Sequence, residues 1–451
     1  MVKTSDDTRK RARSTVKKPA HPSPGPDAGD SPAPLAQGAA IGMPRTLRSR
    51  RPDRESRAFL RWVNLYAWMP LEDRSVRVQR MVWRLMALAM GRRPGVGSVS
   101  RQVIPGPGGP IELRIFTPSG SSDAPRPAFL WCHGGGFMVG GLDTADSICR
   151  SIARRADCIV VAVRYRLAPE HALTASREDF LAALQWVAAH GATIGVDSTR
   201  LAIGGDSAGG NVTAAVAQHV ARQGSLDLRL QVLAYPATDL LHRFPSVEEN
   251  ARGFMVSARQ LDKIGRTVAI PPNAADPWLS PRRNTELQGL APTVVVSAGF
   301  DPIRDDGLDY AARLRAAGVP VRLLHYPGQF HGFMNFDTVI GAGRDALLRI
   351  GDALAAAFRG EAAADQTLEV EDTATAAQAL RTAAGEMART SLVGWVAAER
   401  LALTIFGGFL PGTACATRRF LDSHFVPSGL LQRSALAEGK GLAVHQTYPS
   451  A

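Results

Sequence analysis

Short apolar runs, separated by longer stretches with helical spacing, fill the middle of the chain. Six of these runs have the length of buried strands, and they are Ala128–Cys132, Cys158–Val163, Leu201–Gly204, Leu230–Ala234, Thr293–Ala298 and Val321–His325. Buried strands that alternate with helices are typical of a mostly parallel sheet with helices on both faces. The pattern therefore predicts an α/β fold for this part of the chain.

The region before these runs has two other periodicities. Apolar residues recur every three or four positions over Phe59–Tyr66 and again over Val78–Ala89, which predicts two helices. Alternating runs around the turn signal Gly106–Pro110 predict a β-hairpin over Ser98–Phe116. The two helices are expected either to cap a substrate pocket or simply to pack against the sheet, and the sequence favours neither role.

The points where this regularity begins and ends divide the chain. We predict a basic disordered tail, a helical segment, an α/β domain and a C-terminal extension, over residues 1–54, 55–97, 98–359 and 360–451. The extension opens with an acidic, Ala-rich linker, Gly360–Thr373, and has helical patches at Leu380–Arg389 and Trp395–Phe406. No chemistry is recognisable in it, so its role stays open.

Composition and charge narrow the class of protein. A chain of 451 residues with 45% hydrophobic and 21% charged residues can bury a sizeable core, which excludes a wholly disordered or fibrous protein. The net charge is +12, but the first 60 residues hold 13 Lys and Arg against 6 Asp and Glu. More than half of the excess therefore lies in a leader that is too poor in apolar residues to fold.

The basic leader has two interpretations. It is either a solvated extension or a module that binds nucleic acid or makes transient contact with an anionic membrane. We favour the solvated extension and expect no nucleic-acid partner, because no aromatic or helical pattern accompanies the charges.

The same sequence gives no sign of secretion, membrane insertion or metal binding. No apolar h-region follows the early basic residues, and no apolar run reaches the roughly 18 residues of a membrane span. Four cysteines form neither a disulfide framework nor a CxxC metal pattern. We expect a cytoplasmic protein.

The strongest chemical signal follows the strand Leu201–Gly204, where the chain reads Gly205-Asp206-Ser207-Ala208-Gly209-Gly210. This is a G-x-S-x-G sequence between a strand and a helix, the context of a nucleophile elbow. Glycines are needed there because the sharp turn brings backbones too close for a Cβ atom. Ser207 is therefore the candidate nucleophile, although a G-x-S-x-G sequence alone also occurs in ordinary tight turns.

A glycine run follows the strand Ala128–Cys132, in His133-Gly134-Gly135-Gly136-Phe137. Successive glycines let backbone N–H groups point at a substrate oxygen, as an oxyanion hole requires. We assign the donors to Gly134, Gly135 and Ala208. The remaining residues of the two motifs, which we expect to support the loop geometry, are His133, Gly136, Gly205, Asp206 and Gly209.

A serine nucleophile needs a base and an acid that orients the base. His331 follows the strand Val321–His325 and lies where a loop can deliver an imidazole to the carboxyl edge of the sheet. His325 itself is expected to be a strand residue. Asp301 follows the strand Thr293–Ala298 at the same edge, and Ser207, Asp301 and His331 occur in the chain order of α/β-hydrolases.

Together these motifs resemble the hormone-sensitive-lipase-like family of α/β-hydrolases, carboxylesterases that carry HGGG and GDSAG sequences. The resemblance covers residues 98–358 and rests on His133–Gly136, Gly141–Asp143, Tyr165–His171, Gly205–Gly210, Asp301–Asp305 and His331–Phe333. It implies an α/β-hydrolase fold with an N-terminal helical cap. It also implies Ser207 as nucleophile, His331 as base and Asp301 as orienting acid.

The expected activity is hydrolysis of small-molecule carboxylic esters with short to medium acyl chains, through an acyl-enzyme and without metal or organic cofactor. Amidase or deacetylase activity would use the same residues and stays open. A ligand receptor on the same fold is disfavoured, because His331 is retained. The sequence indicates neither the physiological substrate nor the oligomeric state.

Overall fold

The computed structural model describes residues 43–64, 71–120, 124–371 and 444–449, the last of these as backbone only. The helical patches expected in the C-terminal extension lie outside the described residues. All of the candidate site residues lie within the described ranges.

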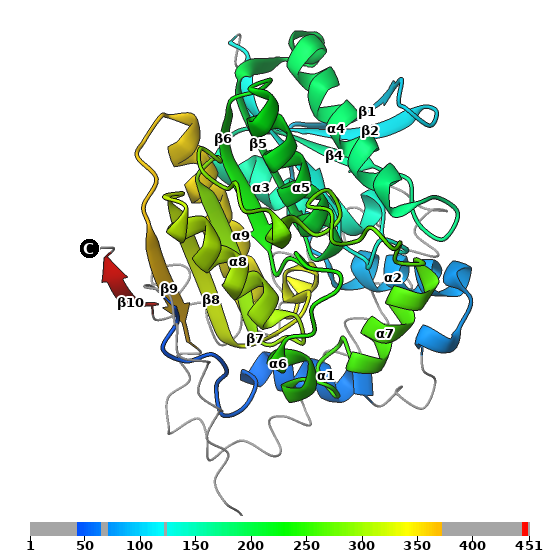
Figure 1. Ribbon diagram of the computed structural model, residues 1–451. Coiled ribbons are helices and arrows are strands. Elements are labelled where there is room, and N and C mark those ends of the chain that lie inside the picture. Colours follow the sequence, from blue (N-terminus) through cyan, green and yellow to red (C-terminus); the bar gives the residue numbers. More distant parts are fainter. Residues whose placement is uncertain (1–42, 65–70, 121–123, 372–443, 450–451) are drawn as a thin grey trace, which may run out of the picture. The chain divides into compact units, whose positions relative to one another are not determined.

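A 10-stranded sheet in the order β1-β2-β4-β3-β5-β6-β7-β8-β9-β10 forms the centre of the described residues (Figure 1). The strands are β1 Ser98–Ile104, β2 Ile111–Thr117, β3 Arg126–Cys132, β4 Ile159–Arg164, β5 Val196–Asp206, β6 Leu228–Ala234, β7 Thr293–Phe300, β8 Val321–Phe330, β9 Gln366–Val370 and β10 Val444–Pro449. Neighbours from β4 to β9 run parallel, whereas β1 with β2, β2 with β4, and β9 with β10 pair antiparallel. The carboxyl ends of the parallel strands therefore meet at one edge of the sheet.

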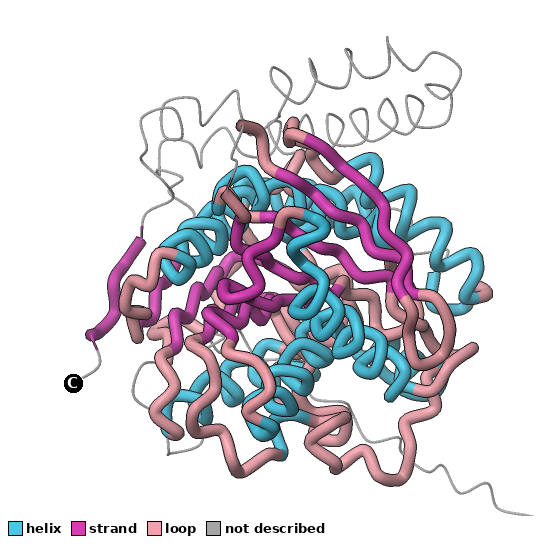
Figure 2. The backbone as a smooth tube through the Cα atoms, turned by 90° about the horizontal axis from the view of Figure 1, so that it is seen from above, coloured by secondary structure: helices cyan, strands magenta, loops and turns pink. Residues whose placement is uncertain are grey.

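Helices connect these strands and cover both faces of the sheet (Figure 2). They are α1 Arg54–Asn64, α2 Val76–Met90, α3 Leu142–Ala156, α4 Leu173–His190, α5 Ala208–Gln223, α6 Pro245–Glu249, α7 Ala258–Thr267, α8 Arg304–Ala316 and α9 Gly341–Phe358. α3 and α9 pack together on one face, where Ile148 and Ile350 contact the apolar layer that contains Trp131. α4 and α5 cover the other face through Phe180 and Val216, and α8 extends this second layer.

The predicted fold class is confirmed. The six predicted runs are β3 to β8, and the predicted hairpin is β1 and β2. Both N-terminal helices form, with α1 in the first predicted stretch and α2 in the second. Their environments differ, because Phe59 of α1 stacks on Phe330 in the core whereas α2 reaches the large cavity described below.

Two boundaries differ from the sequence expectation. β9 lies in the residues assigned to the C-terminal extension, and it pairs with β8 from Arg322 to His325. The acidic composition of the flanking linker hides this short strand in the sequence. Residues 43–53, assigned to the disordered tail, hydrogen-bond to β8 through Ser49 and Asp53, because the charged stretch supplies backbone and side-chain partners rather than apolar surface.

None of the helices in the described ranges has both the length and the apolar composition needed to cross a bilayer.

Candidate active site

Ser207 stands on the sharp turn between β5 and α5. Its backbone angles are φ 55° and ψ −119°, a positive φ that costs a residue with a Cβ atom about 1–3 kcal/mol. The flanking glycines make this turn sterically feasible. A Cβ on Gly205 would lie 2.4 Å from the carbonyl oxygen of Gly209, and a Cβ on Gly209 would lie 2.1 Å from that of Cys132. The turn places the serine hydroxyl at the amino end of α5, where negative charge is favoured.

Two further loops bring a base and an acid to this serine. His331 follows β8, and its Nε2 lies 2.9 Å from Ser207 Oγ. Its Nδ1 lies 2.8 Å from Asp301 Oδ2 at the end of β7. When Nδ1 carries the hydrogen and donates a hydrogen bond to Asp301, the lone pair of Nε2 is available to accept the proton of the serine hydroxyl. The three residues singled out from the sequence thus lie in one continuous hydrogen-bonded relay.

Burial and neighbouring groups hold the side chains of Asp301 and His331 in one arrangement. Asp301 is fully buried, and its second oxygen accepts a hydrogen bond of 2.8 Å from the Ile303 amide. A buried carboxylate needs such partners because burial without them is costly. Tyr235 holds the other side of the imidazole, with its ring edge-on to His331 at 5.0 Å between centroids.

The glycine loop after β3 lies beside the serine turn, but one of its predicted roles is corrected. The Gly134 amide donates to Asp206 Oδ1 at 2.7 Å. A backbone amide has a single hydrogen, so Gly134 is not an available oxyanion donor. The next two glycines have φ of 128° at Gly135 and 57° at Gly136, a region that favours glycine. Both residues line the large cavity with Ala208, and Gly134 does not.

Asp206, the residue before the nucleophile, ties two loops together. One carboxylate oxygen accepts from Gly134, and the other is 3.4 Å from Asn335 Nδ2. Burial raises the pKa of Asp206 to about 6, and the hydrogen bonds from Gly134 and Asn335 oppose that rise. Asn335 also donates to the Gly332 carbonyl at 3.3 Å, next to His331. Sequence reasoning missed Asn335 because no motif marks it, whereas the position of Tyr235 directly after β6 was a usable signal.

His133 supports the glycine loop from within the protein. Its ring stacks on Tyr165 with centroids 4.3 Å apart, and the Tyr165 hydroxyl donates to the His133 carbonyl at 2.6 Å. Burial lowers the pKa of His133 to about 4, so the imidazole is neutral at pH 7. Its surroundings are those of a structural residue, because no carboxylate faces it among the described residues.

A large cavity of about 770 Å³ opens over Ser207 and His331. Much of its wall is apolar and comes from α2, the glycine loop, the segment after β6 and α7. Representative lining side chains are Trp83, Met138, Phe244, Met255, Leu261 and Ile264. Its volume and lining are those of a site for small organic molecules.

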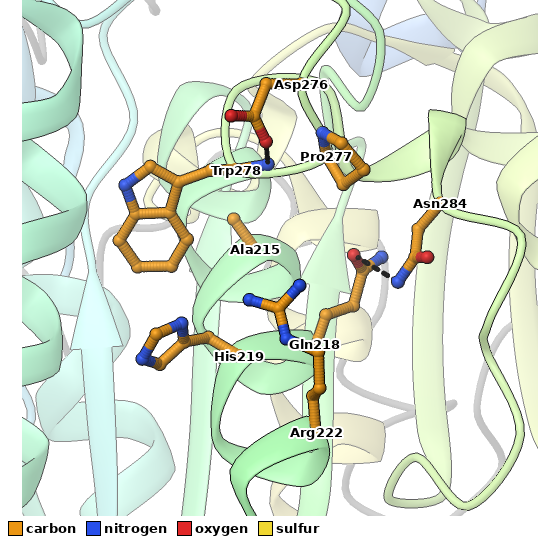
Figure 3. Close-up of a pocket in the computed structure, with 8 residues that line it drawn as sticks. All are labelled: Ala215, Gln218, His219, Arg222, Asp276, Pro277, Trp278 and Asn284. Atoms are coloured by element: carbon orange, nitrogen blue, oxygen red, sulfur yellow. Dashed lines mark hydrogen bonds between the residues drawn. The ribbon is translucent and has the colours of Figure 1, made fainter.

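A second cavity of about 380 Å³ lies further along α5 (Figure 3). Its walls include Gln218, His219 and Arg222 from α5 and Trp278 from a loop. The His219 and Trp278 rings lie with their centroids 5.0 Å apart and their planes tilted by 48°. It shares no lining residue with the large cavity.

The described residues contain no cluster of His, Cys, Asp and Glu side chains suited to hold a metal ion. His325, set aside in the sequence as a strand residue, lies in β8. Its Nε2 hydrogen-bonds to the carbonyls of Thr46 and Leu47 at 2.8 and 3.0 Å. His325 therefore contributes no group to the relay of Ser207, His331 and Asp301.

Comparison with known proteins agrees with this geometry. A family model described as alpha/beta hydrolase fold matches residues 129–335. Esterase LipI of Mycobacterium tuberculosis is 41% identical over 249 residues, covering 54% of this chain and 78% of LipI. Carboxylesterase NlhH of the same organism is 40% identical over 240 residues, covering 52% and 75% of the two chains.

A solved structure of a thermostable esterase from Pseudomonas putida superposes with a TM-score of 0.66 and 31% identity, covering 69% of this chain and 98% of that one. The nucleophile elbow, the glycine loop and these similarities lead to one assignment. The chain belongs to the hormone-sensitive-lipase-like family of ester hydrolases with the α/β-hydrolase fold.

Proposed function

We propose that this protein hydrolyses carboxylic esters through an acyl-enzyme formed on Ser207. The observation that carries the proposal is the unbroken hydrogen-bonded relay from Ser207 Oγ through His331 to the buried Asp301, at the floor of a largely apolar cavity. A binding protein would not need a serine held at a positive φ or a buried acid behind the imidazole.

The reaction proceeds in two halves. His331 Nε2 removes the hydroxyl proton while Ser207 Oγ forms a bond to the ester carbonyl carbon. The imidazolium, stabilised by Asp301, then gives that proton to the departing alkoxide as the ester C–O bond breaks. Water repeats the sequence on the acyl-enzyme, which releases the carboxylic acid and restores Ser207.

The oxyanion of each tetrahedral intermediate is stabilised by backbone amides. Gly135, Gly136 and Ala208 fill this role in the proposal, because they line the cavity beside Ser207 and the Gly134 amide is engaged by Asp206. Donors that are already oriented need no reorganisation as charge develops, and removal of one such donor costs about 10²–10³ in kcat.

The apolar wall of the cavity supports short to medium acyl chains as substrates. Trp83 of α2 is a large lining side chain that is only partly buried, so it can be truncated to test the size of the cavity. Trp83→Ala should shift the preferred acyl length of p-nitrophenyl esters upwards, because the cavity gains volume at that wall. An unchanged acyl-length profile would remove α2 from the substrate site.

The decisive experiment compares the wild type and Ser207→Ala on p-nitrophenyl esters from acetate to decanoate, with the matching anilides in parallel. We expect ester hydrolysis to fall by about 10⁴-fold or more in the variant, with an unchanged circular dichroism spectrum. Comparable turnover by Ser207→Ala would overturn the proposal. Faster cleavage of the anilides than of the esters would replace esterase by amidase.

A further inference from the structure

The chain segment before α1 runs along the end of β8 that leads to His331. We call residues 45–53 the N-terminal strap. β9 pairs with β8 only as far as His325. Beyond that point the strap supplies the partners, because the Ser49 amide donates to the Pro327 carbonyl at 3.0 Å and the Asp53 amide donates to the Gly328 carbonyl at 2.9 Å.

Side chains strengthen the contact between the strap and β8 at Gln329, two residues before His331. Gln329, which is 1% exposed, donates from Nε2 to Asp53 Oδ2 at 2.5 Å and accepts from the Ser56 hydroxyl at 2.8 Å. A Cβ on Gly328 would lie 1.7 Å from Asp53 Oδ1. Glycine at 328 is therefore what lets the Asp53 carboxylate reach Gln329.

A second branch leads from the strap to the acid of the relay. Arg48 pairs with Glu249 at 3.1 Å and donates to Asn250 Oδ1 at 3.2 Å. Asn250 is fully buried, and its Nδ2 donates to the backbone carbonyls of Gly299 at 3.3 Å and Asp301 at 3.1 Å. The Arg48 guanidinium also lies 5.1 Å from the centre of the Phe300 ring.

We propose that the N-terminal strap is a positioning element of the active site, which fixes His331 through Asp53 and Gln329 and fixes Asp301 through Arg48 and Asn250. The inference rests on the proposed function, since it concerns the relay that activates Ser207. Its two branches end on Gln329 and on the Asp301 backbone, although the strap residues lie far away in the sequence. None of the strap residues lines the large cavity.

The physical reason is the sensitivity of proton transfer to geometry. His331 and Asp301 both lie just beyond the ends of strands, where the ladder no longer fixes the backbone. A displacement of about 1 Å at such a group costs up to about 10²-fold in rate, so polar contacts that fix these ends act on kcat. A strap that only covered apolar surface would act on stability instead.

The test uses the full chain with Asp53→Ala, Gly328→Ala and Arg48→Ala. Arg50→Ala is the matched control, because Arg50 is an exposed strap arginine without a side-chain partner among the described residues. Each protein is titrated to completion with a p-nitrophenyl phosphonate, so that kcat for p-nitrophenyl butyrate refers to reactive serines only. We expect kcat per titrated serine to fall about tenfold in the three variants, with KM within twofold of the wild type.

Asp53→Asn separates positioning from general destabilisation. Its amide oxygen can still accept the hydrogen bond from Gln329, so we expect kcat per titrated serine to recover to within about threefold of the wild type. Arg48→Ala covers the case in which Asp53→Ala does not fold, because the Arg48 side chain is 25% exposed and belongs to the other branch.

The outcomes distinguish this inference from the function on which it rests. Wild-type kcat per titrated serine in Asp53→Ala, Gly328→Ala and Arg48→Ala, whatever their melting temperatures, would overturn the positioning role. An equal loss of kcat in Arg50→Ala would also overturn it. Ester hydrolysis that survives Ser207→Ala would instead overturn the proposed function.

Discussion

The large cavity and the second cavity each contain a histidine and a tryptophan, but they differ in what surrounds the imidazole. The large cavity holds His331, flanked on its two nitrogens by Ser207 and the buried Asp301. The second cavity holds His219, which lies beside Trp278 and has no carboxylate partner among the described residues (Figure 3). An imidazole in a cavity is thus not enough for the proposed chemistry. A buried acid and a strained nucleophile must converge on it.

The largest expected effect tests this contrast directly. His331→Ala should lower kcat by about 10⁶-fold, because it removes the base that acts on Ser207. His219→Ala in the second cavity should leave ester hydrolysis within twofold of the wild type. Steady-state kinetics on p-nitrophenyl butyrate measure both variants. A large loss in His219→Ala would mean that the second cavity takes part in the reaction.

The next effect concerns the acid that the second cavity lacks. Asp301→Asn keeps the shape of the side chain but no longer stabilises the imidazolium and favours the wrong imidazole tautomer. We expect kcat to fall by about 10⁴-fold with little change in KM. Rates should be measured from pH 6 to 9. A rate that recovers with hydroxide concentration at high pH would indicate that His331 no longer acts as the base. A loss below tenfold would contradict the orienting role of Asp301.

A smaller effect is expected at the glycine loop of the large cavity. Gly135→Ala places a Cβ 2.2 Å from the Val139 carbonyl oxygen at a φ of 128°, so the loop and its amides must shift. We expect kcat to fall by about 10²–10³-fold. The matched control is Gly141→Ala, where no atom lies within 4 Å of the new Cβ and the backbone is extended. Equal losses in both variants would exclude a specific role for the Gly135 amide.

The smallest effect is a pH dependence of stability at Asp206. Burial raises its pKa from 3.8 to about 6 in the folded protein, so folding favours the protonated carboxyl. Its contribution to the free energy of unfolding is fully present below pH 3.8 and is lost as the pH rises through about 6. The loss amounts to about 3 kcal/mol at most.

Urea unfolding at pH 4, 5, 6 and 7 measures this effect. Relative to the wild type, Asp206→Asn should become progressively more stable from pH 4 to 6, and the difference should level off towards pH 7. Asp276→Asn, at an exposed carboxylate of the second cavity, is the control for replacing an aspartate by asparagine. A stability difference that is independent of pH would contradict the raised pKa of Asp206.

Much of the fold and the relay could be predicted from local patterns. A buried parallel strand is recognisable from its own apolar run, and the turn around Ser207 needs glycines within two residues of it. His331 and Asp301 could be singled out because each follows such a strand. The hydrogen-bond acceptor of the Gly134 amide could not be predicted, because it lies 72 residues away in the sequence. A glycine run has the same sequence whichever of its amides forms the hydrogen bond.

The sequence by itself determined the strand order along the chain, the nucleophile turn and the candidate base and acid, because these depend on residues close in the sequence. Only the tertiary structure decided which glycines of the loop after β3 line the cavity and what holds the ends of β7 and β8. The contact of Ser49 with Pro327 spans 278 positions, and the composition of residues 45–53 is that of a solvated basic segment. Such polar contacts have no periodicity of their own, so they become visible only when the folded chain brings the partners together.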